Sequence, residues 1–195
     1  MTAAARTLEG LAEPMPIEIK PVALARFAWV LKDLPPGAGE IPAPFILRTA
    51  GEQEVDEAVT IVQSSYNLDP EWSGCAMHIK GTVLPAVVKA LAKEPTCLFV
   101  QHGNRVIAAS VFDCEPGAEG VHLVSGPCVL IEYRNRGIGG ALLGATLDAL
   151  RSRGLAEATG HTRPNGPSAK YLAGKFGGRP EIKSAAPAPA EAEAA

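Results

Sequence analysis

The chain has 195 residues and a formal net charge of −3, with 47% hydrophobic and 20% charged residues. These values are typical of one soluble globular domain, and the small negative charge argues against a nucleic-acid-binding protein. No apolar run approaches the roughly 18 residues of a membrane span, and the N-terminus lacks the apolar core of a secretory signal. We therefore expect a cytoplasmic protein without membrane or nucleic-acid partners.

The first 43 residues are interrupted repeatedly by prolines. Between the prolines, residues 22–31 are apolar enough to form a short helix or strand. We expect residues 1–43 to be a partly ordered N-terminal extension that packs on the domain or on a second copy of it. The predicted domain covers residues 44–183. An Ala/Pro/Glu-rich segment follows at 184–195 and is expected to be a disordered tail.

The first elements of the domain follow from apolar periodicity. A strand is predicted at 45–48, and apolar residues at helical spacing predict a helix over 52–65. Turn-forming residues predict a loop over 67–81, and a second helix is predicted over 84–91.

Three strands come next in the sequence. Residues 97–101 and 105–112 are joined by a short hairpin connection, and a third strand runs from 121 to about 131. Gly126-Pro127 lies inside the third strand, and proline cannot donate to a strand ladder. We therefore expect a bulge or a splayed end at this dipeptide.

The remaining elements alternate. Three glycines after residue 136 and an apolar repeat to Leu150 predict a glycine loop that opens a helix. A strand over 155–162 and a helix over 168–175, headed by Asn165, complete the order. Together these elements predict a mixed α/β (α+β) fold, a sheet flanked by helices in a single domain.

The four cysteines are widely spaced and form no C-x-x-C pair. We therefore expect reduced thiols and no metal site.

The glycine loop is the strongest functional signal. Backbone N–H groups at the start of a helix lack intrahelical partners, and the helix dipole favours an anion there. A dinucleotide fingerprint would need a third glycine at Leu142, and a P-loop would need a lysine after Gly140. The loop satisfies neither pattern.

Arg134-x-x-Gly137-x-Gly139 at this junction resembles the [QR]-x-x-G-x-[GA] acyl-CoA loop of the GNAT superfamily of N-acetyltransferases. The resemblance extends over the element order from about Phe45 to Arg179. It implies a mostly antiparallel central sheet with splayed central strands, and acetyl-CoA as co-substrate without a metal. It also implies that the strand before the loop pairs with the pantetheine arm. The residues expected to contact the cofactor are Val129, Leu130, Ile131, Arg134, Asn135, Arg136, Gly137, Ile138, Gly139, Gly140, Ala141 and Asn165.

The catalytic residues are less clearly indicated. The resemblance implies a tyrosine acid on the last helix, in the form N-x-x-A-x-x-x-Y-x-x-x-G, but counting back from Gly177 places Ala173 at that position. Tyr171 is the available tyrosine, roughly 200° around an ideal helix from position 173. His122 and Glu119 are candidate bases near the start of the third strand of the meander.

Two functions remain open. The first is an N-acetyltransferase that acts on a primary amine of a small molecule or a protein. The second is a non-catalytic acyl-CoA-binding or regulatory module that has lost the tyrosine acid. A nicotinamide dinucleotide enzyme is a third idea. Family members add a hairpin after the last helix, which this chain is too short to form. We expect residues 22–31, or a second subunit in a homodimer, to supply that wall.

Overall fold

The computed structural model describes residues 22–94, 96–118 and 120–181. The expected disordered tail and the start of the N-terminal extension lie outside the described residues. None of the helices within the described ranges is long and apolar enough to cross a membrane.

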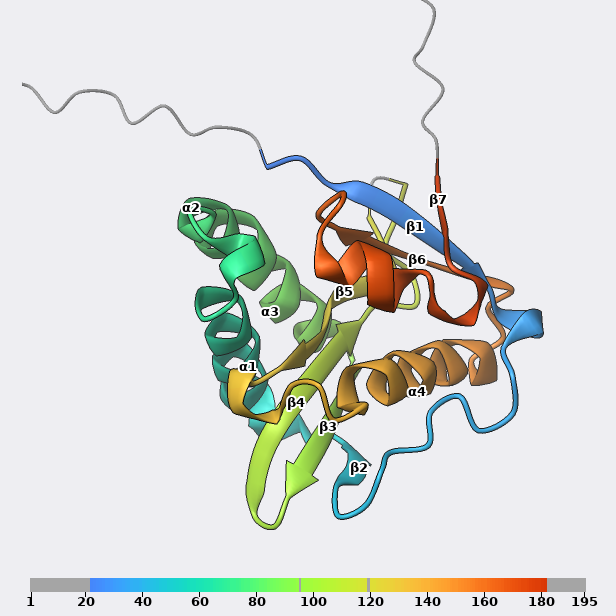
Figure 1. Ribbon diagram of the computed structural model, residues 1–195, viewed down its shortest axis with the longest axis horizontal. Coiled ribbons are helices and arrows are strands. Elements are labelled where there is room, and N and C mark those ends of the chain that lie inside the picture. Colours follow the sequence, from blue (N-terminus) through green and yellow to red (C-terminus); the bar gives the residue numbers. More distant parts are fainter. Residues whose placement is uncertain (1–21, 95, 119, 182–195) are drawn as a thin grey trace, which may run out of the picture.

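A seven-stranded sheet forms the centre of the molecule, in the order β2-β3-β4-β5-β6-β1-β7 (Figure 1). All neighbouring strands are antiparallel except β5 and β6, which are parallel. The strands are β1 (Ala25–Val30), β2 (Ile46–Thr49), β3 (Cys97–His102), β4 (Arg105–Phe112), β5 (Leu123–Val129), β6 (Glu157–Thr162) and β7 (Arg179–Pro180).

Helices cover both faces of the sheet. The α-helices are α1 (Val55–Asn67), α2 (Ala76–His78), α3 (Leu84–Lys93) and α4 (Ile138–Ser152). The short 3-10 and π turns are η1 (Leu31–Asp33), η2 (Glu52–Glu54), η3 (Pro70–Trp72), η4 (Ile79–Val83), η5 (Ile131–Tyr133), η6 (Ser168–Ala173) and η7 (Lys175–Gly177). α1 and α3 pack on one face of the sheet and α4 on the other (Figure 1).

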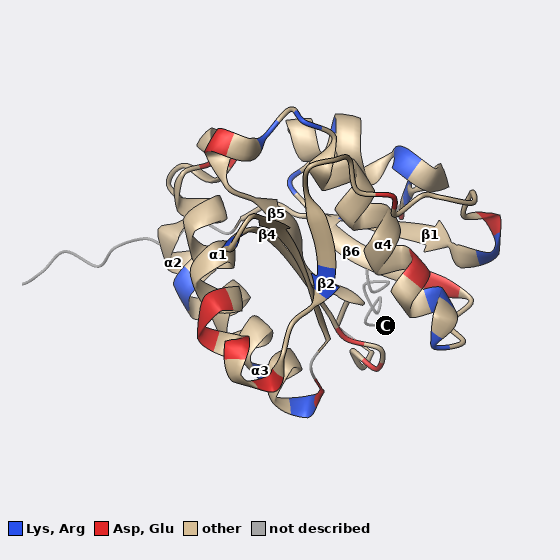
Figure 2. Ribbon diagram, turned by 90° about the horizontal axis from the view of Figure 1, so that it is seen from below, with Lys and Arg blue, Asp and Glu red and all other residues tan. Residues whose placement is uncertain are grey.

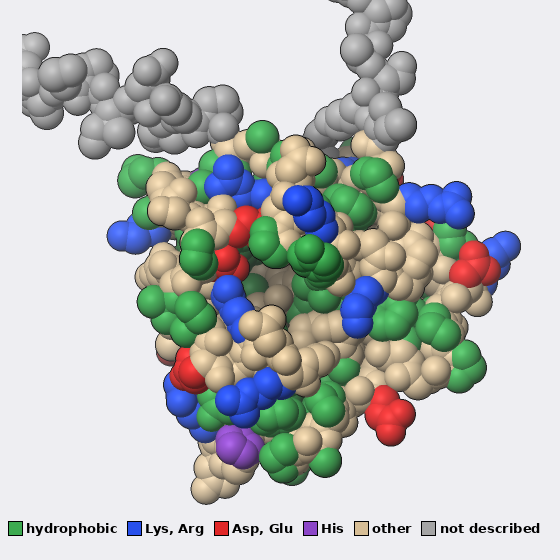
Figure 3. Space-filling model, in the orientation of Figure 1, with side chains coloured by type: hydrophobic (Ala, Val, Ile, Leu, Met, Phe, Trp, Pro, Cys, Tyr) green, Lys and Arg blue, Asp and Glu red, His purple; other side chains and the backbone are tan. Residues whose placement is uncertain are grey.

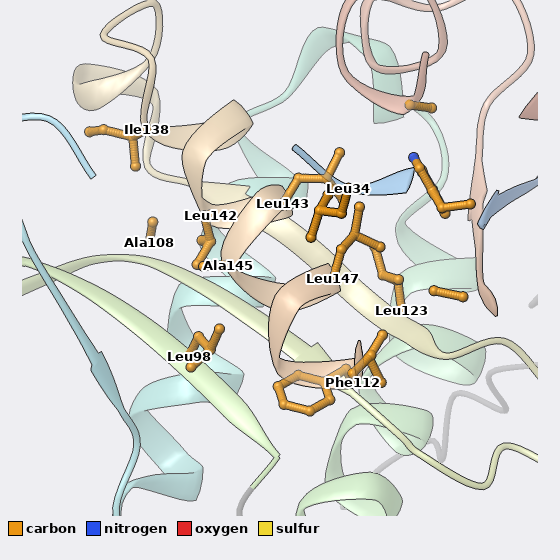
Figure 4. Packing of buried hydrophobic residues seen from close by; sticks show 14 of the residues in the cluster. Leu34, Leu98, Ala108, Phe112, Leu123, Ile138, Leu142, Leu143, Ala145 and Leu147 are labelled. Carbon is orange, nitrogen blue, oxygen red and sulfur yellow. The ribbon is translucent and has the colours of Figure 1, made fainter. Parts of the chain in front are cut away.

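The alternation of side chains along the strands divides the core into two clusters. On β3, Leu98 and Val100 face the α4 side, whereas Cys97 and Phe99 face α1 and α3. The apolar stripe of α4 packs against the first of these faces (Figure 4). This stripe contains Leu142, Leu143, Leu147 and Leu150, each at most 1% exposed. The glycine loop is therefore attached to the most firmly buried helix of the fold.

The structure confirms the predicted fold class and the antiparallel meander of β3, β4 and β5. It also confirms the irregularity at Gly126-Pro127. Ser125 pairs with Val111 and Cys128 pairs with Ala109, so two residues of β5 lie opposite one residue of β4. This arrangement is a β-bulge, and it places the proline where no ladder donor is required.

The predicted loop over 67–81 is wrong in part, because the segment contains η3, α2 and the first residues of η4. Trp72, Cys75 and Ile79 form a small core of their own there. Burial of these three side chains explains why a segment rich in turn formers becomes helical.

The apolar segment near the N-terminus forms β1, which inserts into the sheet. β1 pairs along its whole length with β6, from Ala25 opposite Thr162 to Val30 opposite Glu157. Its other edge pairs with β7, the two-residue strand that follows η7. β1 therefore occupies the side of β6 where we expected a missing wall.

Candidate functional site

A cleft opens in the middle of the sheet, where β5 and β6 diverge. The two strands pair only at Leu123 and Gly160 within the described residues. Beyond that pair they enclose a cavity of about 970 Å³, which appears as a hollow flanked by basic side chains on both sides (Figure 3). Cavities of this size are typical of small-molecule and cofactor sites.

The cavity is lined from both halves of the sheet. One wall comes from the end of α1, from η3 and from β5, and the other from β1, β6 and η6. The α4 loop closes one end. Lining residues include Phe27, Trp29, Tyr66, Asp69, Glu71, Trp72, Cys128, Val129, Arg134, Asn135, Gly139, Leu143, His161, Arg163, Asn165, Tyr171, Leu172 and Ala173.

The glycine loop presents the N-terminus of α4 to this cavity. Gly137 precedes the helix with φ 79°, a left-handed conformation that strongly favours glycine. Its carbonyl accepts the N–H of Ala141 at 3.1 Å, so the first intrahelical bond begins at the loop itself. The N–H groups of the first turn lie before that bond and have no intrahelical partner. They can donate hydrogen bonds to an anion.

Arg134 fastens the loop to the wall of the cleft that α1, η3 and β5 form. Its Nε donates to the carbonyl of Val129 at 3.0 Å, one Nη to the Asp69 carboxylate at 2.9 Å and the other to the carbonyl of Ser65 at 2.9 Å. The motif arginine is therefore engaged at all three nitrogens by acceptors of the protein. A contact between Arg134 and CoA stays a prediction. The three hydrogen bonds show that Arg134 fixes the position of the loop.

Arg136 is the second arginine of the loop. It donates to the carbonyl of Glu132 at 3.2 Å, and its guanidinium lies 5.5 Å from the centre of the Tyr133 ring. Tyr133 also contacts Phe45 and His102 through edge-on ring pairs. The loop is thus supported by an aromatic cluster at the ends of β2 and β3.

The combination of a divergent β5–β6 pair with a glycine loop at the strand-to-helix junction can be compared with known families. The model of the Acetyltransferase (GNAT) family matches residues 60–177, which is more than half of the chain. The chain belongs to this family. The GNAT match covers the cleft wall formed by α1, the β3–β5 meander, α4 and η6. It begins after β1, which the family comparison therefore does not include.

Solved structures show the same GNAT fold. A GCN5-related N-acetyltransferase from Sphaerobacter thermophilus has a TM-score of 0.59 at 20% sequence identity, and the match covers 83% of this chain and 50% of the other. A protein from Drosophila has a TM-score of 0.53 at 13% identity, covering 84% and 50% of the two chains. The chain therefore spans about half the length of these two proteins. Among curated proteins, no significant match was found.

Of the two predicted bases, only His122 lies within the described residues, and it does not line the cleft. Glu119 lies outside the described residues. His122 precedes β5, at the closed end of the β5–β6 pair, and its Nδ1 accepts the backbone N–H of Thr159 at 3.2 Å. The ring also lies 3.0 Å from the Thr159 hydroxyl. Burial lowers the pKa of His122, with a smaller contribution from nearby Arg26. His122 does not line the cavity. Its contacts with Thr159 join the start of β5 to β6.

The helix after Asn165 differs from the predicted one. Ser168–Ala173 forms a π turn, in which each hydrogen bond spans five residues instead of four. Such a turn accommodates one extra residue, so the spacing of a regular α-helix does not predict which side chains of this segment share a face. Ala173 is buried at 6% exposure, whereas Tyr171 is 75% exposed. Both line the cavity, and so does Asn165.

Two contacts join η3 to the segment after β6 across the cleft. The Glu71 carboxylate accepts the Ser168 hydroxyl at 2.9 Å, and Arg163 donates to the Glu71 carbonyl at 2.6 Å. Tyr66 lies nearby and packs edge-on against Trp72, with 4.7 Å between the centres of the two rings. Burial raises the pKa of Tyr66 well above its usual value, so its hydroxyl stays protonated.

No motif in the sequence marks the side chains of this wall of the cleft. Tyr66, Asp69 and Glu71 lie in a stretch without motif spacing, and Trp29 comes from a segment far away in the chain. The one available signal was the concentration of aromatic and acidic residues over 66–72.

Proposed function

We propose that the chain binds acetyl-CoA in the cleft between β5 and β6 and transfers the acetyl group to a primary amine. The observation that carries this proposal is the opening of the cavity onto the glycine loop at the N-terminus of α4. The diphosphate of CoA would lie on the first turn of α4, and the pantetheine arm would extend along β5. The thioester would then lie between β5 and β6.

The reaction needs little chemistry from side chains. A neutral amine attacks the thioester carbonyl and the C–N bond forms. The C–S bond breaks, the amine nitrogen loses one proton, and the thiolate of CoA takes one up. A backbone N–H of the strand next to the slot would stabilise the oxyanion, as the family resemblance implies. Within the described residues, the cleft carboxylates are Asp69 and Glu71, and Asp69 is paired with Arg134. The acceptor is an amine of a small molecule or of a protein.

Binding should be measured first. Isothermal titration calorimetry with acetyl-CoA, CoA and NADH should show micromolar binding of the two CoA compounds and none of NADH. Absence of CoA binding would contradict every acyl-CoA function for this cleft. Tighter binding of NADH than of CoA would favour a dinucleotide enzyme instead.

A non-catalytic acyl-CoA-binding or regulatory module is the second candidate. The burial of Ala173 at the position where the family carries its tyrosine acid favours it. Thiol release from acetyl-CoA, measured with a panel of small amines and lysine-containing peptides, separates the two. Binding without amine-dependent thiol release across the panel would favour the module.

Tyr171→Phe tests whether a tyrosine acid is used. Because Tyr171 is 75% exposed, water reaches the same place, and we expect turnover to fall by less than roughly fivefold. A loss of about 100-fold with unchanged acetyl-CoA affinity would assign Tyr171 as the acid instead. Lys170→Ala, on the same turn, is the matched surface control.

A further inference from the structure

The side chain of Lys175 lies across the first turn of α4. A Cβ added to Gly140 would stand 2.7 Å from the ammonium nitrogen of Lys175 and 3.4 Å from its Cδ and Cε. A glycine at position 140 therefore allows the ammonium to approach the helix backbone closely. Lys175 is in η7, thirty-five residues further along the chain than Gly140.

The backbone at Lys175 is anchored by β1. The indole N–H of Trp29 donates to the carbonyl of Lys175 at 3.0 Å, and the N–H of Gly178 donates to the same oxygen at 3.2 Å. Trp29 itself is 3% exposed and belongs to the core beneath α4. The start of the lysine side chain is thus fixed by the strand that completes the sheet.

This position is electrostatically unfavourable without a ligand. The N-terminal end of a helix carries a partial positive charge, and α4 has no acidic residue in its first turn. None of the ion pairs within the described residues includes Lys175. Two positive charges therefore lie close together beside Gly140, next to Gly139, which lines the cleft. An anion bound at this helix end would be attracted by both.

The two arginines of the loop do not take this place. Arg134 is neutralised by Asp69, and Arg136 lies over the Tyr133 ring. Lys175 is the cation whose nitrogen lies next to the backbone of the first turn of α4.

We propose that Lys175 is a cofactor-binding residue that holds the diphosphate of acyl-CoA against the first turn of α4. This inference rests on the proposed function, because it requires that CoA occupy the cleft. It adds that the charge in contact with the diphosphate comes from η7 and is placed there by β1. The arginine of the loop instead fastens the loop to α1 and η3.

The test compares the affinities of Lys175 variants for CoA and for dephospho-CoA, which keeps the diphosphate and lacks the 3′-phosphate. By calorimetry, Lys175→Gln should weaken the binding of both compounds by about tenfold, and Lys175→Arg should restore most of the affinity. The loss should shrink as salt is raised, because an exposed charge is screened. Lys170→Gln is the control and should bind as the unmodified chain does.

Three results would overturn the inference. CoA binding by the unmodified chain together with equal binding by Lys175→Gln would remove the role of Lys175 and leave the proposed function intact. A loss seen with CoA but not with dephospho-CoA would assign Lys175 to the 3′-phosphate. Absence of CoA binding by the unmodified chain would remove the proposed function as well. Thermal unfolding of each variant without ligand verifies that the fold is retained.

Discussion

The N-terminal end of α1 has acidic residues in and just before its first turn, whereas the first turn of α4 consists of glycines and apolar residues. Asp56 and Glu57 lie in the first turn of α1, and Glu54 precedes it. Figure 2 shows these acidic residues in succession along α1 and the turn before it. Glu54 also accepts the N–H of Gly51 at 2.7 Å and binds both terminal nitrogens of Arg48.

The difference separates a structural helix end from one that is available to a ligand. The N-terminus of α1 is neutralised within its own segment, so an anion gains little there. The N-terminus of α4 is left without acids, and distant elements hold it in place: Arg134 fixes the loop before it, and Trp29 fixes the backbone of Lys175 beside it. Four substitutions test this contrast.

The largest effect is expected from Trp29→Ala, which removes a buried core side chain beneath α4. We expect the free energy of unfolding to fall by roughly 3–5 kcal/mol, measured by urea denaturation. Val30→Ala on the same strand is the control, because Val30 is 42% exposed and should change stability by about 0.5 kcal/mol or less. Equal effects of the two variants would mean that β1 is not an integral part of the sheet.

Arg134→Ala should have the second largest effect. It leaves the Asp69 carboxylate and the Ser65 and Val129 carbonyls without their donor, and we expect a loss of about 2 kcal/mol in unfolding free energy. Arg136→Ala removes an exposed charge of the same loop and should cost about 0.5 kcal/mol or less. If Arg134→Ala weakened CoA binding without any loss of stability, the arginine would be a phosphate ligand and not a fastener.

Gly137→Val tests the opening of the α4 loop, with Gly154→Val as its match at the other end of the helix. Both glycines have positive φ, 79° and 88°, so each valine should cost roughly 1–2 kcal/mol in unfolding free energy. Only Gly137→Val should also weaken acetyl-CoA binding by more than about tenfold, because only Gly137 opens the helix end whose next glycine, Gly139, lines the cleft. Similar affinities for the two variants in calorimetry would contradict an anion site at α4.

The smallest effect is expected at α1, where Arg48 and the Gly51 N–H lower the pKa of Glu54 to about 2. The pKa of this carboxyl is lower in the folded state than its usual value of 4.5, so the ionised group stabilises the fold fully above about pH 4.5. This stabilisation is lost as the pH falls from there towards 2. Glu54→Gln should therefore lower the melting temperature by a few degrees at about pH 7 and by less at about pH 3. A difference that does not depend on pH would contradict the role of the charge, and CoA affinity should not change.

Local patterns in the sequence were sufficient for much of the fold. The short, continuous apolar runs of β3 and β4, which are buried on both faces of the sheet, and the helical leucine stripe of α4 are local signals, so these elements could be predicted. The proline in β5 predicted a bulge because a missing backbone donor is a local property. The spacing of Gly137 and Gly139 after Arg134 indicated the GNAT loop for the same reason.

Other features depend on residues that are far apart in the chain. The apolar segment that forms β1 could have been a helix or a strand, and pairing with β6 made it a strand. Ala173 and Tyr171 were difficult to place because the π turn of η6 changes the helical register, and no local signal marks such a turn.

The site shows the same division. The sequence by itself determined a helix whose N-terminus is free of acids, since this follows from consecutive residues. Only the tertiary structure decided which charges lie near it, because side chains such as Arg134 take the acceptors that the fold brings within reach. Asp69 neutralises that arginine, and the carbonyl of Ser65 helps to orient it. Trp29 of β1 holds the backbone of Lys175 beside the first turn of α4. Contacts between distant segments depend on how the sheet closes around the cleft, and no spacing in the sequence records them.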